Sequence, residues 1–343
     1  MASGPGSRRR RSVGLRWGLV GASDIAATSI VPAIRAQPGS SVAAVFSRSA
    51  TRGTDYAARH GIGRSTVRLD DLLADVDAVY VSSTNDLHRE HTLAAAAAGR
   101  HVLCEKPLAL TRDDAVAMVE ACRREGVVLA TNHGRRGDPA LRAARDLVRT
   151  GRLGTPLAAR ADGAGLLPER LRGWRLSDPA AGAGVVLDLV VHEADTLRFV
   201  LADEPVAVHA STAAQGLAGG GVEDAAMGVL RMASGLLASF YCSFTTPCGP
   251  SGLEVHGTEA SMVTRRQPGS AATLVLRRPD GSHDVALPDA PPVGEVTVAA
   301  FEAAVRGDGV PTATGEDGLR SLDVALAVLE SARDGRVVDV PRY

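Results

Sequence analysis

The chain has few cysteines, few aromatic residues, almost no net charge and no long apolar run. Lysine and arginine together number 38, against 39 aspartates and glutamates, so no strong field of one sign favours nucleic acid or an anionic membrane. No hydrophobic run approaches the roughly 20 residues needed to cross a bilayer. The partner that these absences favour is a small molecule, and the 3% of aromatic residues says little about chemistry.

The cysteines and the N-terminus bear on the cellular compartment. Cys104, Cys122, Cys242 and Cys248 are too scattered for a zinc site or for the disulfide framework of a small secreted domain, which fits a reducing cytoplasm. A basic run near the N-terminus lacks the apolar core that follows it in a signal peptide. We therefore expect residues 1–13 to be a flexible extension.

The first part of the chain alternates apolar runs with amphipathic segments, as do the βα units of a parallel sheet, in a chain long enough for two domains. Expected strands are 15–20, 41–47, 78–82, 101–104 and 127–131, and expected helices are 51–60, 87–98 and 111–125. Because βαβ crossovers are right-handed, the sheet is doubly wound. Residues 14–133 are predicted to form a Rossmann dinucleotide-binding domain of the α/β class.

After residue 150 the pattern changes to closely spaced strands. Expected strands are 157–161, 206–214, 225–232, 236–244, 253–257 and 272–277, with a hairpin turn at 279–282. Helices at 186–201 and 318–334 are expected to pack on this sheet or against the first domain. Residues 134–343 are therefore predicted to form an α+β domain with a large, mostly antiparallel open sheet.

The turn after the first strand suits a dinucleotide. Gly21, Ala22, Ser23, Asp24 and Ile25 lie between a strand and a helix, where phosphates bind to backbone amides. Ser23 replaces the second glycine of the usual G-x-G-x-x-G pattern. A strand-to-helix turn with one glycine is also common without any cofactor, so this turn alone leaves both interpretations open.

The tip of the second strand bears on the choice of cofactor. An NAD site usually has an acidic residue here, whereas this chain has Ser47 and Arg48, with Arg52 one turn later. A guanidinium offers a fork of donors that suits a phosphate, although a solvated surface arginine is the plainer interpretation. The hypothesis is NADP(H) in preference to NAD(H).

Polar residues also follow the next two strands. Ser83, Thr84, Asn85 and His88 are candidates to line the cofactor or to cap the following helix. Lys106 lies between Glu105 and Pro107 at the next strand end, and the proline disfavours helical geometry for it. We expect this lysine to lie at the same sheet edge as the cofactor turn, where it could act as a proton donor.

A later helix carries a polar stripe of Asp188, His192 and Asp195, about one turn apart. Asp188 and His192 are spaced to hydrogen-bond, which would fix the imidazole tautomer. The stripe also fits a helix that shows its polar side to solvent. His192, Glu193 and Asp195 are metal-ligand types, but their spacing matches no recognised zinc pattern, so no metal is predicted.

Together these motifs resemble the glucose-fructose oxidoreductase and inositol dehydrogenase family. The likeness rests on the order of a degenerate glycine turn, Thr84-Asn85-x-x-His88, Glu105-Lys106-Pro107 and Asp188-x-x-x-His192, and on the long stretches 80–93, 101–109, 173–176, 222–224, 252–259 and 313–318. It spans about residues 16–340. Within that family, the segment 132–137 and Gly294 depart from an expected His-rich sequence and an expected tyrosine.

The resemblance implies roles for individual residues. It places Lys106 and His192 at the reacting carbonyl, with Asp188 supporting them. It assigns NADP contacts to a larger set: Ala22 to Ile25, Ser47, Arg48, Arg52, Ser83 to His88, Glu105, Asn132, Trp174 and Arg175. It also implies a C-terminal sheet that can serve as a face for homo-oligomers.

The function predicted from the sequence is NADP(H)-dependent reduction of a carbonyl in a sugar or sugar-derived ketone or aldehyde. Three alternatives remain open. A non-catalytic NADP(H)-binding sensor would have the same fold. A glycosidase that uses nicotinamide transiently would consume no net NADPH, and a metal-dependent lyase would be sensitive to chelators.

Overall fold

The computed structural model describes residues 14–265 and 272–342, so the extension expected at residues 1–13 lies outside the described residues. In the described part of the chain, the first sheet has six parallel strands in the order β3-β2-β1-β4-β5-β6. This is the doubly wound order that the sequence predicts. The strands are β1 (Arg16–Val20), β2 (Ser41–Phe46), β3 (Ser65–Thr66), β4 (Ala78–Val81), β5 (His101–Cys104) and β6 (Leu129–Thr131).

Helices on both faces cover this sheet. Ser49 and Thr111 cap two of them, because each side chain accepts a hydrogen bond from the backbone N–H three residues later. The helices are η1 (Ala26–Ile30), α1 (Val31–Arg35), α2 (Ala50–Arg59), α3 (Leu69–Leu73), η2 (Asn85–Leu87), α4 (His88–Ala97) and α5 (Arg112–Arg124). The sequence did not predict β3 and α3, which are too short to show a clear period.

The second sheet has nine strands among the described residues, in the order β14-β13-β12-β11-β7-β10-β9-β8-β15. Its pairs are antiparallel except for β7 with β10, which confirms the mostly antiparallel sheet. The strands are β7 (Pro156–Ala164), β8 (Pro205–Ala213), β9 (Ala225–Met232), β10 (Leu237–Ser243), β11 (Ser251–Gly257), β12 (Ser261–Arg265), β13 (Thr273–Arg278), β14 (Gly281–Asp284) and β15 (Val338–Asp339). β13 and β14 form the hairpin expected at 279–282.

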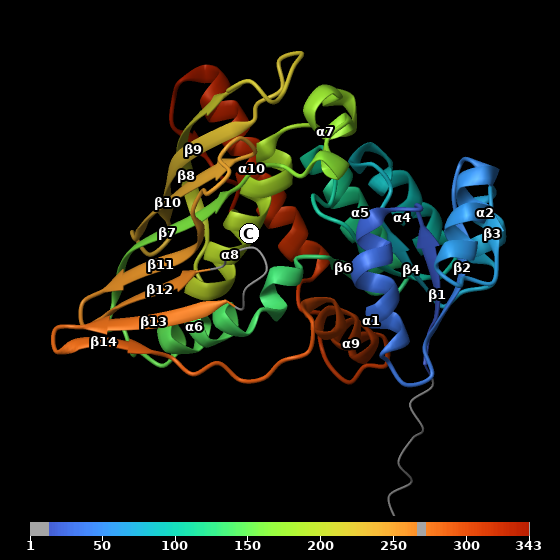
Figure 1. Ribbon diagram of the computed structural model, residues 1–343, viewed down its shortest axis with the longest axis horizontal. Helices are drawn as coiled ribbons and strands as arrows, with labels where there is room; N and C mark the ends of the chain where they lie inside the picture. The colour runs from blue at the N-terminus through green and yellow to red at the C-terminus, as the bar shows by residue number, and fades with distance from the viewer. Residues whose placement is uncertain (1–13, 266–271, 343) are drawn as a thin grey trace, which may run out of the picture.

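The remaining helices lie between and around the two sheets (Figure 1). They are η3 (Gly134–Gly137), α6 (Pro139–Arg149), η4 (Glu169–Leu171), α7 (Trp174–Ser177), η5 (Pro179–Ala181), η6 (Val186–Val190), α8 (Val191–Leu201), α9 (Val293–Val305) and α10 (Gly315–Asp334). Both α8 and α10 contact the second sheet, and α10 also contacts α5 and β6 of the first. The helix expected at 186–201 is continuous but begins with the π-helical turn η6.

The helix α9 packs on the first sheet's own helices although it comes late in the chain. The rings of Trp17 and Phe301 lie 5.0 Å apart, and the Trp17 indole N–H donates to Glu302 over 3.0 Å. This helix was not predicted, and no local pattern could have assigned it to a strand some 280 residues earlier.

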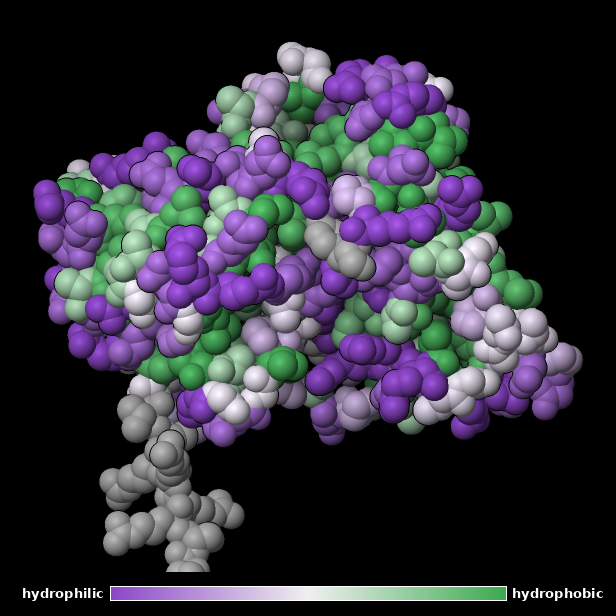
Figure 2. All heavy atoms as spheres, turned by 180° about the vertical axis from the view of Figure 1, so that it is seen from behind, coloured by the Kyte–Doolittle hydropathy of each residue, from purple (hydrophilic) through white to green (hydrophobic). Residues whose placement is uncertain are grey.

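The surface is mixed in polarity. Hydrophilic and hydrophobic residues are interspersed over the face seen in Figure 2. No helix in residues 14–265 or 272–342 is long and apolar enough to cross a membrane. All four cysteines are free thiols, three of them buried, and the cytoplasmic location stays a prediction.

Candidate active site

A cavity of about 710 Å³ opens at the carboxyl ends of β1, β2, β4, β5 and β6 and reaches across to η6 and α8. This is the edge at which open α/β sheets bind ligands. The predicted residues that line it are Gly21, Ala22, Ser23, Asp24, Ile25, Ser47, Arg48, Arg52, Ser83, Thr84, Asn85, Glu105, Lys106, Asn132, Trp174, Arg175, Asp188 and His192. The cavity therefore brings together nearly the whole predicted set.

His88 is the exception, and its predicted cofactor contact is wrong. The side chain is fully buried, and its two ring nitrogens lie 2.9 Å from the Pro107 carbonyl oxygen and 3.2 Å from that of Ser83. Burial lowers its pKa, so the ring is neutral. A neutral ring carries one N–H, so His88 donates to one of these two carbonyl oxygens, and it is not among the residues that line the cavity.

The turn after β1 packs closely on the end of β4. Gly21 has φ +112°, and a Cβ there would lie 2.9 Å from the Ser82 carbonyl group. Ser23, which replaces the second glycine, bonds the Ser82 hydroxyl over 2.7 Å and accepts from the Ala26 N–H. The serine thus joins the ends of β1 and β4 and holds the first turn of the helix.

The cavity wall beyond β2 is basic. Arg48 and Arg52 are both exposed at the tip of β2 and the start of α2, and Arg52 donates to the Ala22 carbonyl over 2.8 Å. Asp24, on the glycine turn, is paired with Arg170 from the opposite domain. The sequence offered no hint of Arg170, because nothing local indicates that its loop faces the turn.

Glu105 is fixed at the end of β5 by neighbouring strands. Its carboxylate accepts from the Tyr80 hydroxyl and from the Asn132 amide, the latter over 2.5 Å. Burial raises the pKa of Tyr80 well above its usual value, and the nearby carboxylate adds to the effect. The two hydrogen bonds to Glu105 keep Glu105 and Asn132 on one wall of the cavity.

Lys106 reaches from β5 to η6, and it is the only lysine in the chain. Its ammonium lies 2.6 Å from Oδ1 of Asp188 and donates to that residue's carbonyl over 2.8 Å. Oδ2 of Asp188 lies 3.7 Å from Arg175, whose guanidinium stacks 4.5 Å from the Trp174 ring. Burial opposes ionisation of Asp188, but Lys106 and Arg175 outweigh it and lower its pKa, so the carboxylate is charged.

The expected bond between Asp188 and His192 is therefore wrong. The carboxylate bonds a cation instead, because a charge-assisted bond is stronger than one to a neutral imidazole. Burial lowers the pKa of His192 well below its usual value, and the positive charge of Lys106 and Arg135 lowers it further. At neutral pH His192 is an uncharged ring that lines the cavity, and its Nδ1 has no partner among the described residues.

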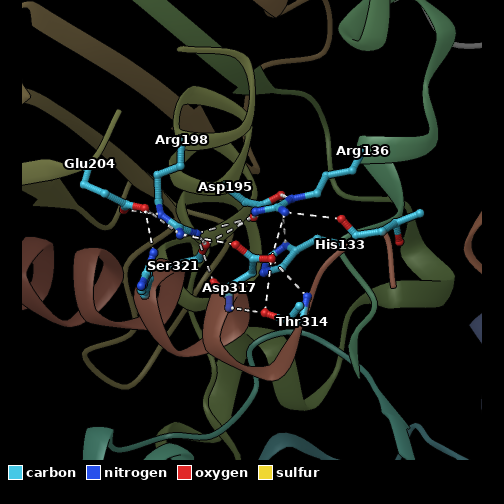
Figure 3. Close-up of polar contacts among 10 residues, drawn as sticks. His133, Arg136, Asp195, Arg198, Glu204, Thr314, Asp317 and Ser321 are labelled. Carbon is cyan, nitrogen blue, oxygen red and sulfur yellow. Dashed lines mark hydrogen bonds and ion pairs between the residues drawn. The ribbon is translucent and has the colours of Figure 1, made fainter. Parts of the chain in front are cut away.

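The rest of the polar stripe on α8 faces neither solvent nor the cavity. Asp195 is buried and takes a two-pronged ion pair from Arg136, at 3.0 and 2.7 Å. Arg136 also bonds Asp317 at 2.9 Å, and Arg198 lies on the other side with Glu204 (Figure 3). Residues of one stripe can thus have separate partners, which helical periodicity alone does not distinguish.

Glu193 is buried and pairs with Arg135, over 2.5 Å. Arg135 lines the cavity next to His192, although the sequence did not single it out as a site residue. Further lining residues that were missed include Thr28, Ser29, Ser49, His91, Gly134, Leu171 and Val293. The described residues hold no group of three metal-ligand side chains.

Comparison with known proteins places this geometry in a family. A model described as "Oxidoreductase family, NAD-binding Rossmann fold" matches residues 15–133, and the GFO/IDH/MocA C-terminal domain matches residues 141–263. The 1,5-anhydro-D-fructose reductase of Ensifer adhaerens is 49% identical over 95% of this chain and 98% of its own length. The chain belongs to the GFO/IDH/MocA family.

Other relatives differ in cofactor. The D-xylose 1-dehydrogenase (NADP(+)) 2 of Haloferax volcanii is 30% identical over 95% of this chain and its whole length. Levoglucosan dehydrogenase, solved with NADH and levoglucosan, has a TM-score of 0.85 at 24% identity, covering 96% of this chain and all of its own. The likeness to the latter shows the fold alone.

A nicotinamide cofactor fits the cavity of this GFO/IDH/MocA member. The cavity volume is in the range of ligand sites, and Gly21 lets the turn that lines it pack on the backbone at the end of β4. Backbone amides at the start of the first helix and the arginines at the tip of β2 suit its phosphates. Lys106, Asp188 and His192 line the same cavity.

Proposed function

We propose that this protein is an NADP(H)-dependent reductase of a sugar-derived ketone or aldehyde. The observation that carries the proposal is the pairing of Lys106 with Asp188 beside His192, in the cavity that also holds the dinucleotide turn. The name of the Ensifer relative makes 1,5-anhydro-D-fructose the first substrate to test. The domain limits expected at residues 14–133 and 134–343 form part of this proposal.

The reduced nicotinamide, when bound, supplies the hydride. The protein's own residues handle charge and protons at the substrate oxygen. Lys106 is a cation held by Asp188, so it donates a hydrogen bond to the carbonyl oxygen and then a proton to the developing alkoxide. His192, as a neutral ring on the same wall, hydrogen-bonds the substrate and orients it.

The preference for NADP(H) rests on the wall beyond β2. Arg48 and Arg52 are placed to bind a 2′-phosphate, and no acidic residue follows β2 to accept from a ribose hydroxyl. We expect Arg48→Ala to weaken NADPH binding at least tenfold and to leave NADH binding unchanged, measured by fluorescence titration. Arg59→Ala, an exposed change at the other end of α2, is the matched control. Equal affinities of the unmodified protein for both cofactors would refute the preference.

The catalytic proposal is tested by steady-state oxidation of NADPH with 1,5-anhydro-D-fructose and a panel of ketoses. We expect Lys106→Ala and His192→Ala each to lower kcat by about 10² or more, with little change in NADPH affinity. Lys106→Arg keeps the charge, but a guanidinium does not give up its proton, so it should be nearly as slow. Full activity in these variants would exclude the assignment, and absence of net NADPH oxidation would favour the sensor or the glycosidase.

The single lysine allows a second test of the same proposal. A lysine-selective activated ester can modify only Lys106 and the terminal amine of each chain. We expect inactivation to follow modification of one side-chain amine, with cofactor and substrate together giving protection.

A further inference from the structure

We propose that His133 is a positioning residue for His192, and that the buried carboxylate of Asp195 orients His133. The inference rests on the proposed catalytic role of His192. It answers a question that the site leaves open, because Asp188, the residue expected to orient His192, is engaged by Lys106.

The imidazole of His133 lies next to that of His192, on the side away from the cavity lining. His133 follows Asn132 directly after β6 and is 1% exposed, and its ring centre is 6.0 Å from that of His192 at an interplanar angle of 78°. Neither ring nitrogen of His133, nor Nδ1 of His192, has a hydrogen-bond partner in the described residues. Folded proteins seldom leave neighbouring buried polar atoms unpaired, so we infer that Nε2 of His133 is the partner of Nδ1 of His192.

Asp195 lies on the other side of His133, so that His192, His133 and Asp195 form a row. Its Oδ2 lies 3.8 Å from Nδ1 of His133, and the Arg136 ion pair holds the carboxylate in place (Figure 3). A carboxylate only accepts, so the proton of His133 belongs on Nδ1, the nitrogen that faces Asp195 across 3.8 Å. Nε2 of His133 is then left as an acceptor for the Nδ1–H of His192.

This order of donors fixes the tautomer of His192. With its proton on Nδ1, the ring keeps a lone pair on Nε2, which can accept a hydrogen bond from a substrate hydroxyl. A direct bond between imidazoles, with about 2.9 Å between nitrogens, would bring the ring centres to roughly 5 Å. The ring centres are 6.0 Å apart, so the two rings must approach by about 1 Å for this bond to form.

Burial keeps both rings neutral, and the cations around them act in the same direction. Lys106 and Arg135 face His192, while Arg136, Arg198, Asp195 and Asp317 surround His133. Burial lowers the pKa of His133 to about 4, in spite of Asp195. The row therefore orients His192 through hydrogen bonds and does not need a charged His133.

The test compares two amides at position 133. His133→Asn keeps a donor for Asp195 but is too short to reach His192, whereas His133→Gln is long enough to offer it an acceptor. We expect His133→Asn to lower kcat roughly tenfold, with KM and cofactor affinity unchanged, and His133→Gln to stay within about threefold of the unmodified protein. In His133→Asn the acid limb of the kcat profile should also move to lower pH, because the acceptor that stabilises the His192 imidazolium is gone.

Controls separate this inference from the proposed function. Ser321→Ala removes a hydroxyl that bonds Arg198 and Asp195 and should leave kcat and its pH profile unchanged. Full activity in His192→Ala would end the proposed function, whereas an impaired His192→Ala beside an unimpaired His133→Asn would overturn this inference alone. Equal loss in the two amide variants would also overturn it, because that result indicates packing. If His133→Asn does not fold, a tenfold loss of kcat in a stable His133→Gln overturns the inference.

Discussion

Burial disfavours charge on both Asp188 and His192, but only Asp188 has cations in contact with it. Lys106 and Arg175 hold it ionised, while burial, aided by the charge of Lys106 and Arg135, lowers the pKa of His192 and keeps it neutral. The sequence identified these residues correctly as neighbours and paired them wrongly. It could not do better, because the competing cation comes from β5, which lies some 80 residues earlier in the chain.

The sequence itself marks Lys106 as unusual. Lys106 is the single lysine in a chain whose other basic residues are arginines. An ammonium is the more readily titrated of the two cations, so its retention at one position indicates a proton-transfer role. Arg135 and Arg170, in contrast, are two of many arginines, and only the fold distinguishes them.

The titration of two groups, His133 and Asp317, should lower the stability of the protein in acid in two steps. His133 has a pKa of about 4 in the folded protein and an ordinary value of 6.5, so between pH 6.5 and 4 the unfolded chain takes up a proton that the folded chain does not. The free energy of unfolding should fall by about 3 kcal/mol over this window from His133 alone. Urea unfolding from pH 7 to 4 measures it.

A second group titrates in a separate window and is the control. Arg136 offsets burial and lowers the pKa of Asp317 to about 2 from 3.8, so its stabilisation is complete above pH 3.8 and is lost as the pH falls towards 2. His133→Asn should make the upper slope shallower by about one proton, and Asp317→Asn should make the lower slope shallower. Identical slopes in His133→Asn and the unmodified protein would contradict the prediction.

At the level of helices and strands, elements with a clear period were predictable. The strands β1, β2, β4 and β5 and the helices α2, α4 and α5 begin and end within about two residues of the expected limits. The helix α10 begins three residues earlier than expected, because Thr314 and Asp317 form a capping box. The strand β12 and the helices α6 and α9 were missed, since their assignment depends on partners distant in the chain.

The glycine loop before η6 positions the helix that carries Asp188 and His192. Gly184 has φ +113°, and a Cβ there would lie 2.1 Å from Oε1 of Glu223, which accepts from the Val186 N–H at the start of η6. Gly184→Ala should displace Glu223 and shift the helix that carries Asp188 and His192. We expect a loss of kcat of tenfold or more and a loss of stability of about 1–3 kcal/mol, measured by kinetics and urea unfolding.

Gly165→Ala is the matched control for this change. Gly165 lies in the loop after β7, and a Cβ there would meet nothing within 4 Å. Its activity and stability should equal those of the unmodified protein. Equal behaviour of the two alanine variants would show that the loop does not position the helix.

At the level of the whole molecule, the cavity is shared between the two halves of the chain. The first sheet contributes the dinucleotide turn and Lys106, and the second half contributes Trp174, Arg175, Asp188 and His192. The ion pair of Asp24 with Arg170 and the packing of α9 on α1 add contacts across the same boundary. The sequence predicted both halves, whereas their mutual placement depends on contacts that no local pattern encodes.

The outer face of the second sheet is the surface that we expect to join two copies of the chain. Met227, Val229 and Leu237 are 57%, 50% and 56% exposed, and Met227 is paired across strands with Tyr241. Large apolar side chains gathered on one open face favour a self-complementary, two-fold contact.

Light scattering after size exclusion should therefore give the mass of a dimer. Val229→Asp should give a monomer that keeps its secondary structure by circular dichroism, because the side chain is exposed within the chain, whereas Val310→Asp, 76% exposed elsewhere, should remain dimeric. A monomeric unmodified protein at micromolar concentration would exclude this interface.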